Sequence, residues 1–140
     1  MTFEFEVLGT PVPQGSMRAF LPKGWDRPII TSDNKKLKAW RAQVSQMAVL
    51  LWNHKPLPRT IPIKLFLTFY FLRPKSNKDV HKTTKPDVDK LCRAILDSLT
   101  GIVYEDDSQV IKAVIYKLYG DVERVEIDLE TLETQGELLR

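Results

Sequence analysis

The chain has 140 residues, of which 43% are hydrophobic and 28% are charged, as is typical of a globular protein. This length supports one hydrophobic core, so we expect a single domain over residues 1–140, with residues 133–140 as a fraying tail. The longest apolar run is too short to span a bilayer, the N-terminus does not resemble a signal peptide, and the lone Cys92 cannot form an internal disulfide. These features argue against a membrane-spanning or disulfide-stabilised protein, and we expect a cytoplasmic one.

The net charge is only +3, but the charges are unevenly distributed along the chain. Residues 1–93 carry 17 Lys and Arg against 7 Asp and Glu, whereas residues 94–140 carry 4 against 11. A basic stretch of this kind often presents a positive surface to a polyanion such as a nucleic acid. The alternative is that the two halves neutralise each other in the folded protein, and charge alone supports both interpretations equally.

The first expected element is a strand, because apolar residues alternate with glutamates over residues 3–7. Residues 9–30 contain several prolines and glycines, which predict a loop without regular structure. A long helix then runs from an N-cap at Asp33 to about Asn53. Its apolar stripe follows spacings of three and four and consists of Leu37, Trp40, Val44, Met47, Ala48 and Leu51.

Residues 63–72 are rich in aromatic side chains and nearly continuously apolar, which predicts a central strand covered on both faces. A polar, lysine-rich loop leads from it to a second helix over residues 88–99. Residues 109–119 and 122–132 follow as two strands joined by a two-residue hairpin at Gly120-Asp121. The order β-α-β-α-β-β predicts an α/β (α+β) fold with one mixed β-sheet and two main helices.

The most informative segment is residues 85–110, KPDVDKLCRAILDSLTGIVYEDDSQV, which contains five aspartates within 21 residues. In the second helix, Asp89, Arg93 and Asp97 fall one turn apart, opposite the apolar face that includes Leu91 and Ile95. Carboxylates held by adjacent elements suit Mg²⁺, which can activate water against a phosphodiester. No CxxC, HExxH or P-loop pattern competes with this set, and we expect Cys92 to be a small core residue.

Each charged residue of the segment also has a purely structural interpretation. The aspartates at the entry to the helix could cap it or complement its dipole. Asp97 could pair with Arg93 at i, i+4, and Asp106-Asp107 could serve a turn before the next strand. Lys82 and Lys85 could be solvated loop lysines. Each piece alone is weak evidence, whereas their order and spacing together are specific.

The whole segment resembles the core motif of the RusA-type endodeoxyribonucleases, particularly phage and prophage members. The matching pieces are a basic residue, Asp-x-Asp, a basic residue one helical turn later, an inward Asp, and Asp-Asp-x-Gln-Val before a strand. They are Lys85, Asp87, Asp89, Arg93, Asp97, Asp106, Asp107, Gln109 and Val110. The match is specific over about 26 residues, and the loop Val12-Pro13-Gln14-Gly15-Ser16 adds a less distinctive similarity.

The resemblance implies a homodimer that binds four-way (Holliday) DNA junctions and cuts two strands symmetrically in recombination and repair. It also implies that Asp87, Asp89 and Asp107 bind Mg²⁺, for which Mn²⁺ could substitute, and that Arg93 assists catalysis. Asp97, as an orienter of Arg93, and Asp106 would support these groups without binding the metal.

Basic residues in the first turns of the long helix, in the loop that follows the central strand, and beside the Asp-x-Asp are expected to grip the DNA backbone. This DNA-binding set comprises Lys35, Lys36, Lys38, Arg41, Arg73, Lys75, Lys82, Lys85 and Lys90.

Two positions depart from the family pattern. Lys90 stands where the family usually has Asn, and Arg93 stands where it commonly has Lys. Arginine keeps the charge and can hold a phosphate, but it cannot take part usefully in proton transfer. Two other functions stay open: a nuclease for flaps or replication forks, and a junction-binding protein that does not cut.

Overall fold

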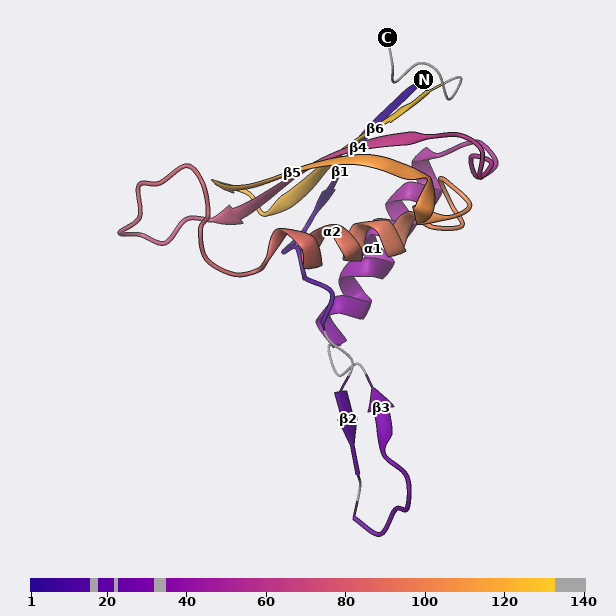
Figure 1. Cartoon of the computed structure of the whole chain (residues 1–140). Coiled ribbons are helices and arrows are strands. Elements are labelled where there is room, and N and C mark those ends of the chain that lie inside the picture. The colour runs from indigo at the N-terminus through magenta and orange to yellow at the C-terminus, as the bar shows by residue number, and fades with distance from the viewer. Residues whose placement is uncertain (16–17, 22, 32–34, 133–140) are drawn as a thin grey trace.

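A computed structural model describes residues 1–15, 18–21, 23–31 and 35–132 of the chain. Four strands form one mixed sheet in the order β1-β6-β4-β5, two helices pack on it, and a short hairpin projects from the body (Figure 1). In chain order the elements are β1 (Thr2–Leu8), β2 (Arg18–Phe20), β3 (Ile29–Thr31), α1 (Lys35–Leu51), β4 (Ile63–Leu72), α2 (Val88–Leu99), the 3₁₀ turn η1 (Asp107–Gln109), β5 (Val110–Gly120) and β6 (Arg124–Thr131).

The predicted α/β fold and the order β-α-β-α-β-β are confirmed, with the β2–β3 hairpin as an addition. The expected N-cap Asp33 and the tail 133–140 lie outside the described residues. No helix in the described part of the chain is long and apolar enough to cross a membrane.

The β4–α2–β5 unit is a parallel crossover, and it explains why the expected hairpin at Gly120-Asp121 is wrong. β5 pairs with β4 in parallel, and β6 pairs antiparallel with the other edge of β4 and with β1. Because the crossover places β5 directly beside β4, β6 cannot also occupy that edge. The connection from β5 to β6 therefore crosses the end of β4, and the last two strands are not neighbours in the sheet.

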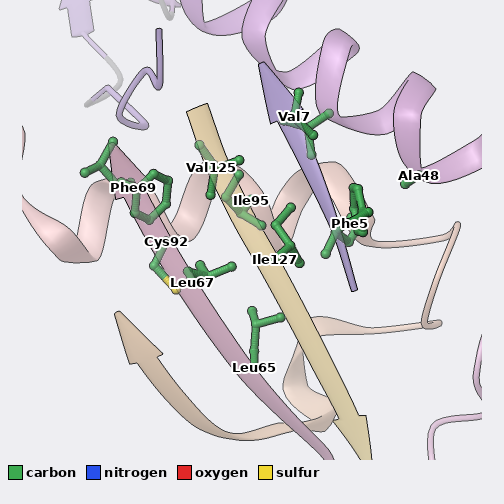
Figure 2. Close-up of a cluster of buried hydrophobic side chains, with 14 of the residues drawn as sticks. Phe5, Val7, Ala48, Leu65, Leu67, Phe69, Cys92, Ile95, Val125 and Ile127 are labelled. Atoms are coloured by element: carbon green, nitrogen blue, oxygen red, sulfur yellow. The ribbon is translucent and has the colours of Figure 1, made fainter. Parts of the chain in front are cut away.

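The hydrophobic core lies between one face of the sheet and the two helices. On β4, Leu65, Leu67 and Phe69 are fully buried, and Figure 2 shows them beside Ile95 and Cys92 of α2. Since side chains alternate across a strand, every second residue of β4 points into this core. Cys92 is a buried core residue, as predicted.

The opposite face of β4 is only half-buried, so the prediction that this strand is covered on both faces is wrong. Both helices lie on the same side of the sheet (Figure 1), because the crossover through α2 and the packing of α1 against α2 cover one face only. On the other side, Phe66 and Thr68 floor an open groove of about 490 Å³ whose carboxylates come from β1 and β6. The negative potential of this acidic face is unfavourable for a polyanion.

Residues 9–30 contain regular structure that the sequence pattern did not predict. β2 and β3 pair antiparallel from Arg18↔Thr31 to Phe20↔Ile29. Gly24 and Pro28 do not prevent this hairpin because both lie outside its two strands. Gly24 adopts a positive φ of 83° in the connecting turn, and Pro28 stands directly before β3.

Helix α1 buries Leu37, Trp40, Val44 and Ala48 of the predicted stripe, and Met47 is half-buried. Leu51 is instead 43% exposed. The helix ends at this residue, and Trp52 takes the next place in the core.

Candidate active site and nucleic-acid interface

Helix α2 separates core residues from charged residues in the way that its sequence predicts. Leu91, Ala94, Ile95, Ser98 and Leu99 are buried. On the opposite face Asp89 and Arg93 are exposed and Asp97 is half-buried. The strong amphipathicity of this helix therefore fixes three charged side chains in a row along its outer surface.

Asp87 is the N-cap residue of α2 by its backbone conformation, but its side chain makes no capping hydrogen bond. Its Oδ2 atom instead lies 3.9 Å from the Lys90 Nζ atom, and both side chains are about half exposed. The capping interpretation therefore does not account for this carboxylate, which stays accessible at the helix entry.

Lys117 of β5 holds the loop that leads to Asp87. Its Nζ atom donates hydrogen bonds to the carbonyl oxygens of Thr84 at 2.6 Å and Pro86 at 2.7 Å. Partial burial and then the nearby Lys82 lower the pKa of Lys117, whereas the Asp87 carboxylate raises it. The sequence analysis missed this residue, because β5 contains both Lys112 and Lys117 and the sequence alone does not show which of the two is half-buried.

We expect Lys117→Met to lower DNA cleavage about 10-fold or more while the fold is retained, because side chains that orient a catalytic group typically matter by 10–100-fold. The matched control is Lys112→Met, which removes an exposed lysine from the same strand. Cleavage rates and thermal unfolding of the two variants should be compared. Equal activity of the two variants would rule out a positioning role for Lys117.

At the other end of α2, Asp106 and Asp107 lie in the turn that enters β5. Asp106 caps η1 by accepting a hydrogen bond from the Ser108 backbone nitrogen at 3.0 Å, which lowers the pKa of its carboxyl group. Asp107 makes no such capping bond. Partial desolvation and then the Asp106 carboxylate raise its pKa, and Asp97 adds a smaller contribution in the same direction. Asp97 and Asp107 are therefore electrostatic neighbours.

Gln109 fastens this acidic turn to the body. Its Nε2 atom donates to the carbonyl oxygens of Pro58 at 2.7 Å, Ile61 at 3.1 Å and Leu57 at 3.3 Å, and its Oε1 atom accepts from the Asp106 backbone nitrogen at 2.9 Å. The side chain is 5% exposed. Such a fully bonded buried amide fixes the backbone on which Asp106 and Asp107 stand.

The three expected metal ligands are not gathered within one chain. Asp87 and Asp89 lie at the N-terminal end of α2, Asp97 lies in its last turn, and Asp107 begins η1, which follows the helix. Among the described residues, no three His, Cys, Asp or Glu side chains are close enough together to hold a metal ion. The chemistry of the donors suits Mg²⁺, which prefers carboxylate oxygens, but the arrangement within a single chain is incomplete.

Arg93 forms no ion pair with Asp97 within the described part of the chain, although the two are four residues apart on one helix face. Asp97 instead contributes to the raised pKa of the Asp107 carboxyl group. The guanidinium group of Arg93 is exposed and free to meet an anion from outside.

The predicted DNA-binding residues occupy two segments on either side of the N-terminal end of α2 in the view of Figure 1. Lys35, Lys36 and Lys38 are exposed in the first turns of α1, and Arg41 is half-buried. The other segment is the loop after β4 together with the start of α2, where Arg73, Lys75, Lys85 and Lys90 are exposed.

The second half of this loop is hydrogen-bonded to the edge strand β5. The Lys82 backbone nitrogen donates to the Lys117 carbonyl oxygen at 3.1 Å, and the Tyr119 nitrogen donates to the Val80 carbonyl oxygen at 2.9 Å. The Lys82 Nζ atom lies 5.3 Å from the centre of the Phe71 ring and 2.9 Å from the Thr84 Oγ1 atom. Lys82 is therefore partly engaged within the chain and is not a freely solvated loop lysine.

A pocket of about 300 Å³ lies at the entry to α2 and is lined by Pro13, Lys85, Pro86, Asp87 and Lys90. The Gln14 backbone nitrogen donates to the Lys90 carbonyl oxygen at 2.9 Å, so the loop after β1 forms one wall of this site. A carboxylate flanked by two lysines in a shallow pocket is suited to a phosphate group with a bound cation.

Fold and site together define an α/β protein with carboxylates along the exposed face of a helix and lysines around them, which suits a phosphate-bearing ligand with a bound cation. Residues 9–130 match the model of the family described as endodeoxyribonuclease RusA, and the chain belongs to this family. The chain is 32% identical over 139 residues to the uncharacterized protein YqaN of Bacillus subtilis (strain 168), covering 89% of this chain and 92% of the relative. It is 29% identical over 136 residues to the crossover junction endodeoxyribonuclease RusA of Lactococcus phage r1t, covering 91% and 95%.

Proposed function

We propose that the protein is a magnesium-dependent endonuclease that resolves four-way (Holliday) DNA junctions by paired symmetric cuts in recombination and repair, and that it acts as a homodimer. The observation that carries the proposal is membership of the RusA family over residues 9–130, combined with carboxylates fixed along the outer face of α2. A junction with approximate two-fold symmetry offers two equivalent cleavage positions, which a two-fold dimer matches with two sites.

Asp87, Asp89 and Asp107 are the proposed metal ligands, and Mn²⁺ would substitute for Mg²⁺. When bound, the ion would supply an activated water and charge neutralisation at phosphorus. The chain's own residues position the DNA: Arg93, unpaired among the described side chains, binds the phosphate that carries developing charge, and the exposed lysines bind the flanking backbone. Lys117 and Gln109 hold the two backbone segments that carry the aspartates.

The test is a panel of end-labelled DNA substrates, namely a four-way junction, a flap, a replication fork and a linear duplex, each with Mg²⁺ or with EDTA. Preferred cutting of the junction that disappears with EDTA is the expected result. Preference for the flap or the fork would assign a different structure-selective nuclease. Binding without cutting in both Mg²⁺ and Mn²⁺ would leave a junction-binding protein.

Lys90 offers a test of how this chain departs from its family. Its ammonium group pairs with Asp87, and a divalent cation would have to displace it. We expect Lys90→Asn to lower the Mg²⁺ concentration for half-maximal cleavage by up to about five-fold, since an exposed ion pair contributes up to about 1 kcal/mol. Lys85→Asn is the control, because Lys85 lines the same pocket and has no ion pair with a described residue. A Mg²⁺ titration of both variants at saturating junction decides the matter, and an unchanged or raised Mg²⁺ requirement in Lys90→Asn would contradict the expectation.

A further inference from the structure

The β2–β3 hairpin stands apart from the four-stranded sheet. It forms a two-stranded sheet of its own and projects from the body (Figure 1). Its strands have only three residue pairs, from Arg18↔Thr31 to Phe20↔Ile29. A two-stranded hairpin of this size is marginally stable at best and adds little to the stability of the domain. The projection therefore calls for a role outside the core.

The connection between the two strands carries an exposed tryptophan, Trp25. Its exposed fraction is 57%, whereas the other two tryptophans, Trp40 and Trp52, are 3% and 6% exposed. Trp52 packs edge-on against Phe3 with 4.9 Å between the ring centres. Among the described residues, Trp25 takes part in no aromatic or cation–π contact. A side chain that usually dominates cores and interfaces is here left open to an outside partner.

Basic side chains flank this ring. Lys23 and Arg27 are exposed two positions on either side of Trp25, and Asp26 is the one acidic residue of the hairpin. Residues 18–31 carry three basic residues against this single aspartate, and exposed lysines follow in the first turns of α1. An aromatic ring among cations suits single bases of a nucleic acid, because the cations bind the backbone and the ring stacks on a base.

The length of the hairpin allows Trp25 to reach the bases of a DNA molecule whose backbone is bound at the start of α1. Thr31, at the base of the hairpin, lies four positions before Lys35, where α1 begins. Six positions separate Trp25 from Thr31, and at about 3.3 Å per residue they span at most about 20 Å. The major groove of DNA is only about 8.5 Å deep. A tip that starts beside the phosphates can therefore reach the level of the base pairs.

We propose that Trp25 stacks on a base at the branch point of a DNA junction, and that Lys23 and Arg27 bind the phosphates beside that base. Inside a linear duplex a ring can enter only by unstacking two neighbouring base pairs, which costs free energy. At a branch point the stack of base pairs is already interrupted, so the cost is lower. Trp25 therefore distinguishes branched from linear DNA. This inference rests on the proposed function, since its ligand is branched DNA, and it adds the residue that recognises the branch.

Binding titrations by fluorescence anisotropy test this discrimination, with a four-way junction and a linear duplex, both in EDTA so that nothing is cut. Trp25→Ala should weaken junction binding about 5-fold or more, as expected for the loss of one stacked base, and should leave duplex binding nearly unchanged. Trp25→Phe retains a ring and should keep most of the preference for the junction. Lys23→Ala should weaken binding of both substrates alike, because phosphate contacts are the same in both.

The matched control is Tyr116→Ala, which removes an aromatic ring of similar exposure, 54%, from β5. It should bind both substrates as the wild type does. A second measurement uses the unmodified protein: Trp25 is the accessible tryptophan, so acrylamide should quench its fluorescence in the free protein. The junction should protect it from acrylamide, and the linear duplex should protect it much less.

Equal junction binding by Trp25→Ala and Tyr116→Ala would overturn the proposal, as would equal weakening of junction and duplex binding by Trp25→Ala. Unchanged acrylamide quenching of the wild type on the junction would overturn it without any variant. Because all these measurements are made without cleavage, a protein that shows the predicted binding but cuts no junction would refute the proposed function and leave the stacking contact standing.

Discussion

Asn in place of Asp89 or Asp107 should lower junction cleavage by at least about 100-fold while junction binding stays equal or improves. Each substitution removes a proposed metal ligand, and even residues that only support such ligands typically matter by 10–100-fold. Binding should survive because the lysines that hold the phosphate backbone are untouched, and fewer negative charges would face the DNA. Single-turnover cleavage and gel-shift titrations of each variant measure the two effects separately.

The control for these variants is Asp121→Asn, which makes the same chemical change at an exposed position in the connection between β5 and β6. Thermal unfolding should show all three proteins to be as stable as the wild type, since Asp89 and Asp107 are exposed. Undiminished cutting by Asp89→Asn or Asp107→Asn would remove these residues from the catalytic set. Loss of the folded state would instead show that they are structural.

Gln109→Leu should produce the largest loss of stability among single polar substitutions at the site. The variant leaves three backbone carbonyl groups without the Gln109 amide and the Asp106 nitrogen without its acceptor. The Leu57 and Pro58 carbonyl oxygens keep backbone partners, so the Ile61 carbonyl and the Asp106 nitrogen are the two groups left unsatisfied. Unsatisfied buried groups cost about 1–3 kcal/mol each, so we expect a loss of about 2–6 kcal/mol in the free energy of unfolding. For a chain of this size the melting temperature would fall by roughly 10 °C.

The same variant should also reduce cleavage at temperatures where it is still folded, because the backbone of Asp106 and Asp107 loses its anchor. Gln46→Leu is the control: it makes the same chemical change at an exposed position of α1 and should alter the melting temperature by little. Denaturant unfolding measures the loss of stability. Cleavage rates are compared at about 20 °C below the lower of the two melting temperatures, which is roughly twice the expected shift in melting temperature. A Gln109→Leu protein as stable as the control would show that the carbonyl groups find other partners.

The elements that the sequence predicts well are those whose pattern is local. Alternation in β1 and the apolar face of α2 at spacings of three and four are properties of neighbouring residues, and the structure has both. The hairpin expected at Gly120-Asp121 failed because strand neighbours depend on the α2 crossover, a feature of the whole chain. The uncovered face of β4 was missed for a related reason. An aromatic residue such as Phe66 gives the same apolar sequence pattern whether its side chain is buried or half-buried.

For the candidate site, the sequence identifies the aspartates but not their spatial grouping. Motif spacing cannot show that Asp87, Asp89 and Asp107 form no common cluster among the described residues, because this depends on how α2 packs against β5. Lys117 was missed since its role comes from two carbonyl groups more than thirty positions away in the chain. The alternative that Asp87 serves as a cap could be decided only from its side-chain contacts.

The most direct test of the central claim uses a supercoiled plasmid that extrudes a cruciform, incubated with the purified protein and Mg²⁺. Supercoiling is lost after a single nick, and the cruciform is then reabsorbed, so linear product arises only when both symmetric cuts occur within one bound complex. We predict linear plasmid as the main product, with ends mapping to opposite strands at the cruciform base, and no product with EDTA. Accumulation of nicked circles alone, or an intact plasmid in Mg²⁺, would contradict the account.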